Sequence, residues 1–386
     1  MKNPDAIVIG AGIVGATVAL SLTNAGLQVL IVDRGPVSSG TTGAGEGNIL
    51  VSDKEPGPEL TLALRSRDLW FDLQDDVGDC FELEAKGGVV VARRDPEPLF
   101  HLAKKQEQCG VLIQKLDNYA VHELEPYIHP EIEHGILYSQ DAQCQPMLAA
   151  AHVIRAVVNR GGKFIAGAEV QRILHHNGSV SGIETTQGSF STKIVVNAAG
   201  TWAGNIAERA GSQLPIAPRK GFILVTEPVN KYIFHKVYDS DYVANVASSD
   251  ADLQTSTVVE GTQSGTILIG ASRQRVGFDT TMNYEIVRRL AAQATSLFPI
   301  LRDVQLLRIY SGFRPYAPDH LPVIGEDAQV NGLWHSAGHE GAGIGLAPGS
   351  AQLLTDRILA RDTFMDAEPF SPKRFQSSLT QLRSAI

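Results

Sequence analysis

Residues 6–33 read AIVIGAGIVGATVALSLTNAGLQVLIVD. Two apolar runs, at 6–9 and 29–32, lie on either side of a glycine turn and an amphipathic stretch. Neither run alternates with polar residues, which is typical of strands covered by helices on both faces of a parallel sheet. The stretch therefore predicts one strand–helix–strand unit of an α/β fold.

The glycine turn carries a second signal. Gly10, Gly12 and Gly15 form G-x-G-x-x-G between the predicted strand and helix, and Asp33 ends the second strand. Such glycines permit a tight turn, the approach of a pyrophosphate to the helix N-terminus and close helix packing, while the acidic residue can accept hydrogen bonds from a ribose. The pattern predicts a Rossmann-like dinucleotide site, with a turn that binds nothing as the alternative. It does not separate NAD from FAD, so a nicotinamide-linked dehydrogenase stays open.

Composition limits the classes of protein. The chain has 386 residues, 43% of them hydrophobic and 19% charged, which fits a globular protein of about two domains. A formal net charge of -9 disfavours nucleic acid and anionic lipid as general partners. The three cysteines have no C-x-x-C spacing, which argues against a disulfide framework, an iron–sulfur cluster or a metal site in this chain. With no apolar run of about 18 residues and no signal-peptide pattern, we expect a cytoplasmic chain without a transmembrane segment.

The middle of the chain predicts a second domain. Short β-rich runs at 87–94 and 221–228 are separated by turn residues, as in an antiparallel sheet, whereas helical patterns at 147–162 and about 349–360 return to the α/β style. We therefore expect a Rossmann-like domain formed by residues 1–80, 145–215 and 306–386, interrupted by an α+β domain with a mainly antiparallel sheet formed by residues 81–144 and 216–305.

An ordered set of motifs resembles one family. Besides the first 26 residues, these motifs are SSGTTGAGEGN (38–48), VVNAAGTWA (195–203), SGFRPYAPDHLPVIG (311–325) and SAGHEGAGIGLAP (336–348). Together they resemble the D-amino-acid oxidase family of FAD-dependent amine oxidoreductases, which includes glycine oxidase and sarcosine oxidase. Within it, GHEGAGIGLAP and VEGTQSGTILIGASRQRVGFD (259–279) are most similar to the β subunits of opine oxidases, D-hydroxyproline dehydrogenases and hydrogen cyanide synthase.

The resemblance implies FAD, bound non-covalently, and a set of residues around it. Asp33 would meet the adenosine ribose, although most relatives have Glu there, and Val170 would bracket the adenine unless it is a plain core valine. Ser39, Thr41 and Thr42 would offer hydroxyls, unless they only cap the loop. Gly343 and Ile344, ahead of the last helix, would donate N–H groups to the flavin C2 carbonyl. The full predicted set is Gly10, Gly12, Ile13, Val14, Gly15, Asp33, Arg34, Ser39, Thr41, Thr42, Gly45, Gly47, Asn48, Val170, Ala199, Gly200, Trp202, Arg314, Gly341, Ala342, Gly343 and Ile344.

Three residues are predicted at the reacting end. Arg314 in GFRP matches the arginine that clamps the substrate carboxylate in the family, and a planar guanidinium suits that bidentate contact; a surface salt bridge is the alternative. His339 is either a residue of the redox site or a structural hydrogen-bonding group. Glu260 either binds a cationic group of the substrate or lies on the exposed face of an edge strand. Four tyrosines, which are pocket phenols or packing residues, are Tyr232, Tyr238, Tyr242 and Tyr316.

These expectations add up to an enzyme that oxidises the C–N bond of a small carboxylate-bearing amine to an imine, which water hydrolyses to a 2-oxo acid. By resemblance the substrate is an opine, D-hydroxyproline or glycine. The resemblance also implies partner subunits that carry an iron–sulfur cluster or a further flavin, through which the chain could be peripheral to a membrane. A flavoenzyme that acts on 2-hydroxy acids and a non-catalytic subunit remain as alternatives.

Overall fold

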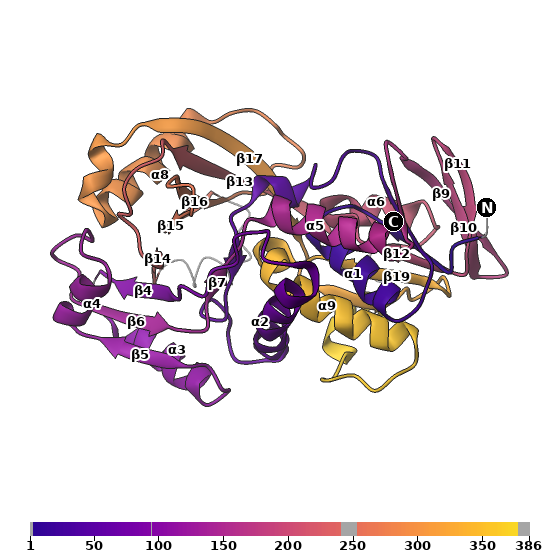
Figure 1. The fold of residues 1–386 in the computed structure, drawn as a ribbon, viewed down its shortest axis with the longest axis horizontal. Coiled ribbons are helices and arrows are strands. Elements are labelled where there is room, and N and C mark those ends of the chain that lie inside the picture. Colours follow the sequence, from indigo (N-terminus) through magenta and orange to yellow (C-terminus); the bar gives the residue numbers. More distant parts are fainter. Residues whose placement is uncertain (1–2, 94, 241–252, 377–386) are drawn as a thin grey trace, which may run out of the picture.

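The computed structural model describes residues 3–93, 95–240 and 253–376 of the chain. A six-stranded sheet forms one side of the molecule (Figure 1). Its central strand β1 pairs in parallel with β2 and β12, as the apolar runs predict, and only the edge strand β18 is antiparallel to its neighbour among the described strands. The strands, in spatial order, are β18 (Val323–Glu326), β19 (Leu333–Ala337), β12 (Ile194–Asn197), β1 (Ala6–Ile9), β2 (Val29–Asp33) and β8 (Lys163–Ala166).

Four helices pack together on this sheet and form the largest apolar core. They are α1 (Ile13–Asn24), α2 (Pro58–Val77), α5 (Pro146–Asn159) and α9 (Gly343–Ile358). Helix α1 contacts both α5 and α9, and α2 covers α9 from the other side. Helix α1 carries Gly15, Ala16 and Ala19 among its apolar residues and is buried over most of its length.

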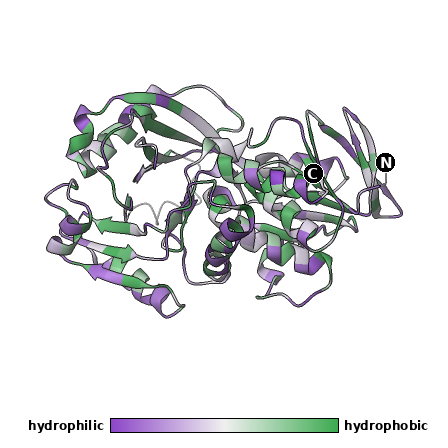
Figure 2. Cartoon of the chain, viewed as in Figure 1, coloured by the Kyte–Doolittle hydropathy of each residue, from purple (hydrophilic) through white to green (hydrophobic). Residues whose placement is uncertain are grey.

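An eight-stranded sheet forms the other side of the molecule (Figure 1). Among its described pairings only β4 with β14 is parallel, so the sheet is mainly antiparallel, as the sequence predicts. Helix α8 (Tyr284–Leu297) covers one face, and Figure 2 shows that β4 consists mostly of hydrophobic residues. The spatial order is β17 (Leu306–Tyr316), β13 (Ala217–Thr226), β16 (Ile267–Arg273), β15 (Gln254–Gly261), β14 (Lys236–Asp239), β4 (Gly88–Ala92), β6 (His134–Tyr138) and β5 (Ile113–Leu116).

Smaller elements complete the described chain. A three-stranded sheet packs beside the six-stranded one and a two-stranded sheet lies between the two large sheets. Their strands are β11 (Gly188–Ser191), β10 (Ser179–Thr185), β9 (Val170–His176), β3 (Asn48–Ile49) and β7 (Ala142–Gln143); the short helices are α3 (Glu97–Glu107), α4 (Asn118–Leu124) and α6 (Ala203–Glu208). None of the helices described here is both long enough and apolar enough to cross a membrane.

The predicted fold class is confirmed, with one correction to an element. The last helix begins at Gly343, not near residue 349, although glycines and Pro348 disfavour a helix. Burial of its first turns against α1 and α2 overrides that local preference. The exact domain bounds taken from the sequence stay a prediction.

A buried carboxyl group joins the elements between the two sheets. Asp141, ahead of β7, accepts the backbone N–H of Val51 at 2.8 Å, and its other oxygen is hydrogen-bonded to the Ser52 hydroxyl. The Tyr238 hydroxyl on β14 in turn contacts Ser52. Burial raises the pKa of Asp141 to about 7. Asp141 is therefore mostly protonated in the folded chain at mildly acidic pH.

We expect Asp141 to make the stability of the fold depend on pH. Its folded-state pKa of about 7 exceeds the ordinary value of 3.8, so the folded chain binds the extra proton and loses stability as the pH rises through that window. A difference of this size corresponds to about 4 kcal/mol. Asp141→Asn keeps an acceptor for Val51 and cannot ionise, so urea unfolding of both proteins at about pH 5 and pH 8 should show a steeper decline for the wild type. Equal declines would contradict this account.

Candidate active site

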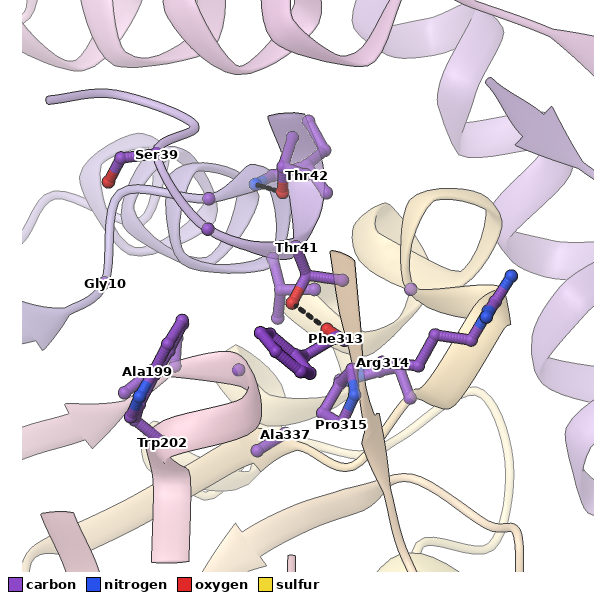
Figure 3. Close-up of a pocket in the computed structure, with 18 of the residues that line it drawn as sticks. Gly10, Ser39, Thr41, Thr42, Ala199, Trp202, Phe313, Arg314, Pro315 and Ala337 are labelled. Atoms are coloured by element: carbon purple, nitrogen blue, oxygen red, sulfur yellow. Dashed lines mark hydrogen bonds between the residues drawn. The ribbon is translucent and has the colours of Figure 1, made fainter. Parts of the chain in front are cut away.

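A cavity of about 910 Å³ runs between the two large sheets. Its walls come from the β1–α1 turn, the loop at 35–48, the η2 turn (Gly200–Trp202), strands β13 and β17, and the start of α9. Figure 3 shows Gly10 and Ser39 toward one end and Arg314 toward the other. The predicted site residues that line it are Gly10, Gly12, Ile13, Val14, Asp33, Arg34, Ser39, Thr41, Thr42, Gly45, Asn48, Val170, Ala199, Gly200, Trp202, Arg314, His339, Gly341, Gly343 and Ile344.

The β1–α1 turn brings the N-terminus of α1 to the cavity. Gly10 has φ of 117°, and a side chain on it would overlap with the Ala198 carbonyl. A side chain on Gly15 would overlap with the Gly10 carbonyl, so Gly15 lies behind the turn and does not line the cavity. The Thr42 hydroxyl accepts the Ile13 N–H at 3.0 Å (Figure 3). The N–H groups of Ala11 and Ile13 thus have acceptors within the protein, and those of Gly12 and Val14 lie beside the cavity where the sequence predicts a pyrophosphate.

The start of α9 reaches the cavity from the other side. Pro348 has no N–H for the Ile344 carbonyl, which instead accepts the indole N–H of Trp70 at 3.0 Å. The Ser66 hydroxyl donates to the Gly345 carbonyl at 2.6 Å and accepts the Gly349 N–H at 3.0 Å. Two α2 side chains thus satisfy the groups that the proline disturbs. The first N–H groups of α9, at Gly343 and Ile344, have no acceptor within the helix and lie at its positive end beside the cavity.

At the Gly10 end, Asp33 holds the turn itself. Its carboxylate accepts the N–H groups of Ala11 at 2.7 Å and Gly35 at 2.8 Å. The Arg34 guanidinium lies 4.1 Å above the centre of the Trp202 ring, on the turn predicted to close over the cofactor. Both oxygens of Asp33 therefore have a structural use, and its contact with a ribose stays a prediction.

At the far end, Arg314 lies on β17 opposite Arg219 on β13. Its Nη1 donates to the Ser272 carbonyl at 2.8 Å. The guanidinium occupies the space that a side chain on Gly221 would fill, so this glycine makes room for it. Figure 3 shows Arg314 extending away from Gly10 and Trp202. The arginine is half-buried in the cavity wall.

His339 lines the cavity but is built into the fold. It is 3% exposed, and its Nε2 lies 3.0 Å from the Ser350 hydroxyl on α9. Burial lowers the pKa of His339 to about 4, so the ring is neutral near pH 7. This environment fits the structural alternative better than a charged role in the redox site.

Several predicted residues lie elsewhere. Glu260 is 1% exposed on the interior strand β15 and pairs with Lys236 at 2.5 Å, so the exposed-edge alternative is wrong. It does not line the cavity, and its position does not support the predicted contact with a cationic group of the substrate. Gly47 does not line the cavity; it allows the chain to pass close to the Cys144 carbonyl. Ala342, the N-cap of α9, also lies off the cavity wall. The tyrosines off the wall are Tyr232, Tyr238 and Tyr316, while Tyr242 falls outside the described residues.

Other residues of the cavity wall were not predicted from the sequence motifs. Glu46 lines the cavity and is 6% exposed, although it lies within the GTTGAGEGN loop whose neighbours were singled out. An acidic residue among glycines and threonines, with no basic partner nearby in sequence, was the available signal. The Phe313 carbonyl accepts the hydroxyls of Thr41 at 2.7 Å and Thr201 at 2.9 Å, a role that no sequence pattern reveals.

The cavity suits a dinucleotide such as FAD. It is elongated, its volume lies near the upper end of the range of roughly 300–1,000 Å³ for small-molecule sites, and two helix N-termini point backbone donors into it. Glycines at the turn leave the backbone open to close approach. The donor set fits an anionic group near α1 and a polar ring edge near α9.

Comparisons with known proteins identify the family. The family described as FAD dependent oxidoreductase (DAO) matches residues 5–357, and the chain belongs to it. The chain is 29% identical to a glycine oxidase of Pseudomonas aeruginosa, over 95% of this chain and 98% of that protein, and 26% identical to hydrogen cyanide synthase subunit HcnC of the same species, over 97% of each. Among solved structures, L-proline dehydrogenase from P. horikoshii has a TM-score of 0.89 and 26% identity, covering 97% of this chain and 98% of that chain.

The chain is therefore an FAD-dependent oxidoreductase of amino acids or amines, and FAD is its cofactor. The predicted family, fold class and cofactor are confirmed. The nicotinamide-linked alternative is wrong.

Proposed function

We propose that the substrate is a small amino acid or secondary amine with a carboxylate, of the opine, D-hydroxyproline or glycine type. The observation that carries this proposal is the Arg314 guanidinium in the cavity wall, beside the start of α9. A carboxylate that pairs with it would hold the substrate's Cα–H toward the middle of the cavity. The names of the relatives, which include glycine oxidase and L-proline dehydrogenase, support the same substrate class.

In the proposed reaction each residue of the chain has a limited task. FAD, when bound, supplies the oxidising power that removes two electrons and a proton from the substrate's C–N unit. Arg314 fixes the carboxylate, and the first N–H groups of α9 favour negative charge near them. The product is an iminium ion, the protonated form of the imine, which water hydrolyses to a 2-oxo acid and an amine. The amine must be neutral when it is oxidised: no protein base is needed if it arrives neutral, and an amine that arrives as an ammonium first gives one proton to a neighbouring carboxylate or to water.

We propose that FAD is bound without a covalent link. Among the described residues that line the cavity there is no cysteine, and the one histidine, His339, is committed to Ser350. Acid precipitation of the purified protein should therefore release the yellow colour, with FAD in the supernatant. Colour retained in the pellet would contradict this.

Arg314 provides the test of the substrate class. Arg314→Leu should leave a bound carboxylate unpaired and cost about 2–5 kcal/mol in kcat/KM, with FAD content and thermal stability nearly unchanged. Arg314→Lys should recover part of the loss because it keeps the charge but not the planar fork. Arg308→Leu is the control: the residue is exposed on the same strand and does not line the cavity. Near-normal kcat/KM of the Leu variant for a carboxylate substrate refutes the clamp, and loss of FAD would assign Arg314 to the fold.

We also propose that the chain is the amine-oxidising β subunit of a heteromeric dehydrogenase in the cytoplasm, with any membrane contact made through its partners. A relative named as a subunit of hydrogen cyanide synthase, similar over nearly its full length, supports this. The chain's three cysteines cannot by themselves hold a four-cysteine cluster.

Purification of the chain from its native host should then recover a larger complex that contains an iron–sulfur or second flavin subunit. A homodimer with full oxygen-dependent activity would argue against the assembly and leave the assignment of Arg314 untouched.

A further inference from the structure

Glu46 is a buried acid in the wall of the cavity. It lies between the η1 turn (Thr41–Ala44) and β3, and is 6% exposed. Its Oε2 accepts the amide of Asn48 at 3.1 Å. Within the part of the chain that the structure describes, its Oε1 accepts no hydrogen bond. Burying a carboxylate oxygen without a hydrogen bond costs free energy unless a ligand brings a donor to it.

Glu46 shares its nearest ammonium with a second carboxylate. Lys236 lies 3.6 Å from Glu46 Oε2, but its ammonium is closer to Glu260, at 2.5 Å, and also contacts Asn48 Oδ1. The cluster of Glu46, Glu260 and Lys236 thus has two carboxylates for one ammonium, all at most 6% exposed. Of these three residues only Glu46 lines the cavity. Lys86 also interacts with Glu260 but lies off the cavity wall, so a cation in the cavity would meet Glu46.

Glu46 lies at the same end of the cavity as Arg314. The Glu46 carboxylate occupies the space over Gly270, and Arg314 donates to the carbonyl of Ser272, two residues further along β16. The segment at the start of α9 also lies near both groups. Gly45, which precedes Glu46, lies next to the Ile344 side chain, and Gly341 lies next to Arg314. The Glu46 carboxyl group and the Arg314 guanidinium therefore lie on either side of one short stretch of the cavity wall.

We propose that Glu46 binds the ammonium group of the substrate and so selects an amino acid over a 2-hydroxy acid of the same size. This inference rests on the proposed function, in which Arg314 takes the carboxylate. Arg314 alone would accept either class of substrate. A hydroxyl offers no charge to offset the buried carboxylate, whereas an ammonium supplies both a charge and a donor.

The test compares one pair of ligands in the FAD-bound protein. The amino acid that bleaches the wild-type flavin anaerobically is paired with the 2-hydroxy acid of the same carbon skeleton, used as a competitor. The wild type should bind the amino acid more tightly. Glu46→Gln should raise the amino-acid concentration needed for half-saturation by about 10- to 100-fold. It should leave the affinity for the hydroxy acid unchanged or higher.

Glu260→Gln is the matched control, because it removes a carboxylate from the same cluster but not from the cavity wall. Its preference for the amino acid should stay within about twofold of the wild type. If Glu46→Gln lowers the affinity for both ligands equally, Glu46 does not bind the ammonium group. The same conclusion follows if Glu260→Gln changes the preference as much as Glu46→Gln does. If Glu46→Gln does not retain FAD, the wild type alone still tests the proposal: equal affinities for the amino acid and the hydroxy acid would overturn it. If no amino acid bleaches the wild-type flavin, the proposed function fails instead.

Discussion

Hydrogen bonds from Trp70 and Ser66 on α2 hold the first turns of α9 together where Pro348 removes a backbone donor. Without them, the carbonyls of Ile344 and Gly345 would be buried and poorly paired, at a cost of roughly 1–3 kcal/mol each. With them, a glycine-rich segment with poor helix propensity forms a buried helix. The position of this helix fixes one wall of the cavity, so the geometry of the site depends on α2, which itself does not line it.

Helices α1 and α9 then pack against each other with both N-termini at the cavity. Each contributes a partial positive charge, so the cavity favours electron-rich groups close to the two helix ends. Small residues permit the contacts that position the two helices: Gly15 of α1 lies against the Gly10 carbonyl, and Gly349 of α9 lies against α2. These contacts bring the two helix N-termini to the cavity, although neither Gly15 nor Gly349 lines it.

At the far end, the eight-stranded sheet supplies a positive charge, and the loop at 35–48 supplies a negative one. Arg314 fits beside Gly221 on the neighbouring strand, and Glu46 fits over Gly270 on the next strand. Each charged side chain occupies space that a glycine leaves on a neighbouring strand. Lys236 and Glu260 lie beneath this surface as a buried ion pair that does not line the cavity.

The sequence by itself determined the strand–helix–strand unit and the glycine turn, because apolar periodicity and the need for small residues at close approaches are local properties. It also led to Arg314 and to the cofactor, through motifs that occur in a fixed order. Only the tertiary structure decided that α9 begins at Gly343, since burial against α2 outweighs glycine and proline propensity. It also decided that Glu46, and not Glu260, faces the cavity. That choice depends on how the loop at 35–48 lies across β16, two segments more than 200 residues apart in the sequence, and no local pattern records such a contact.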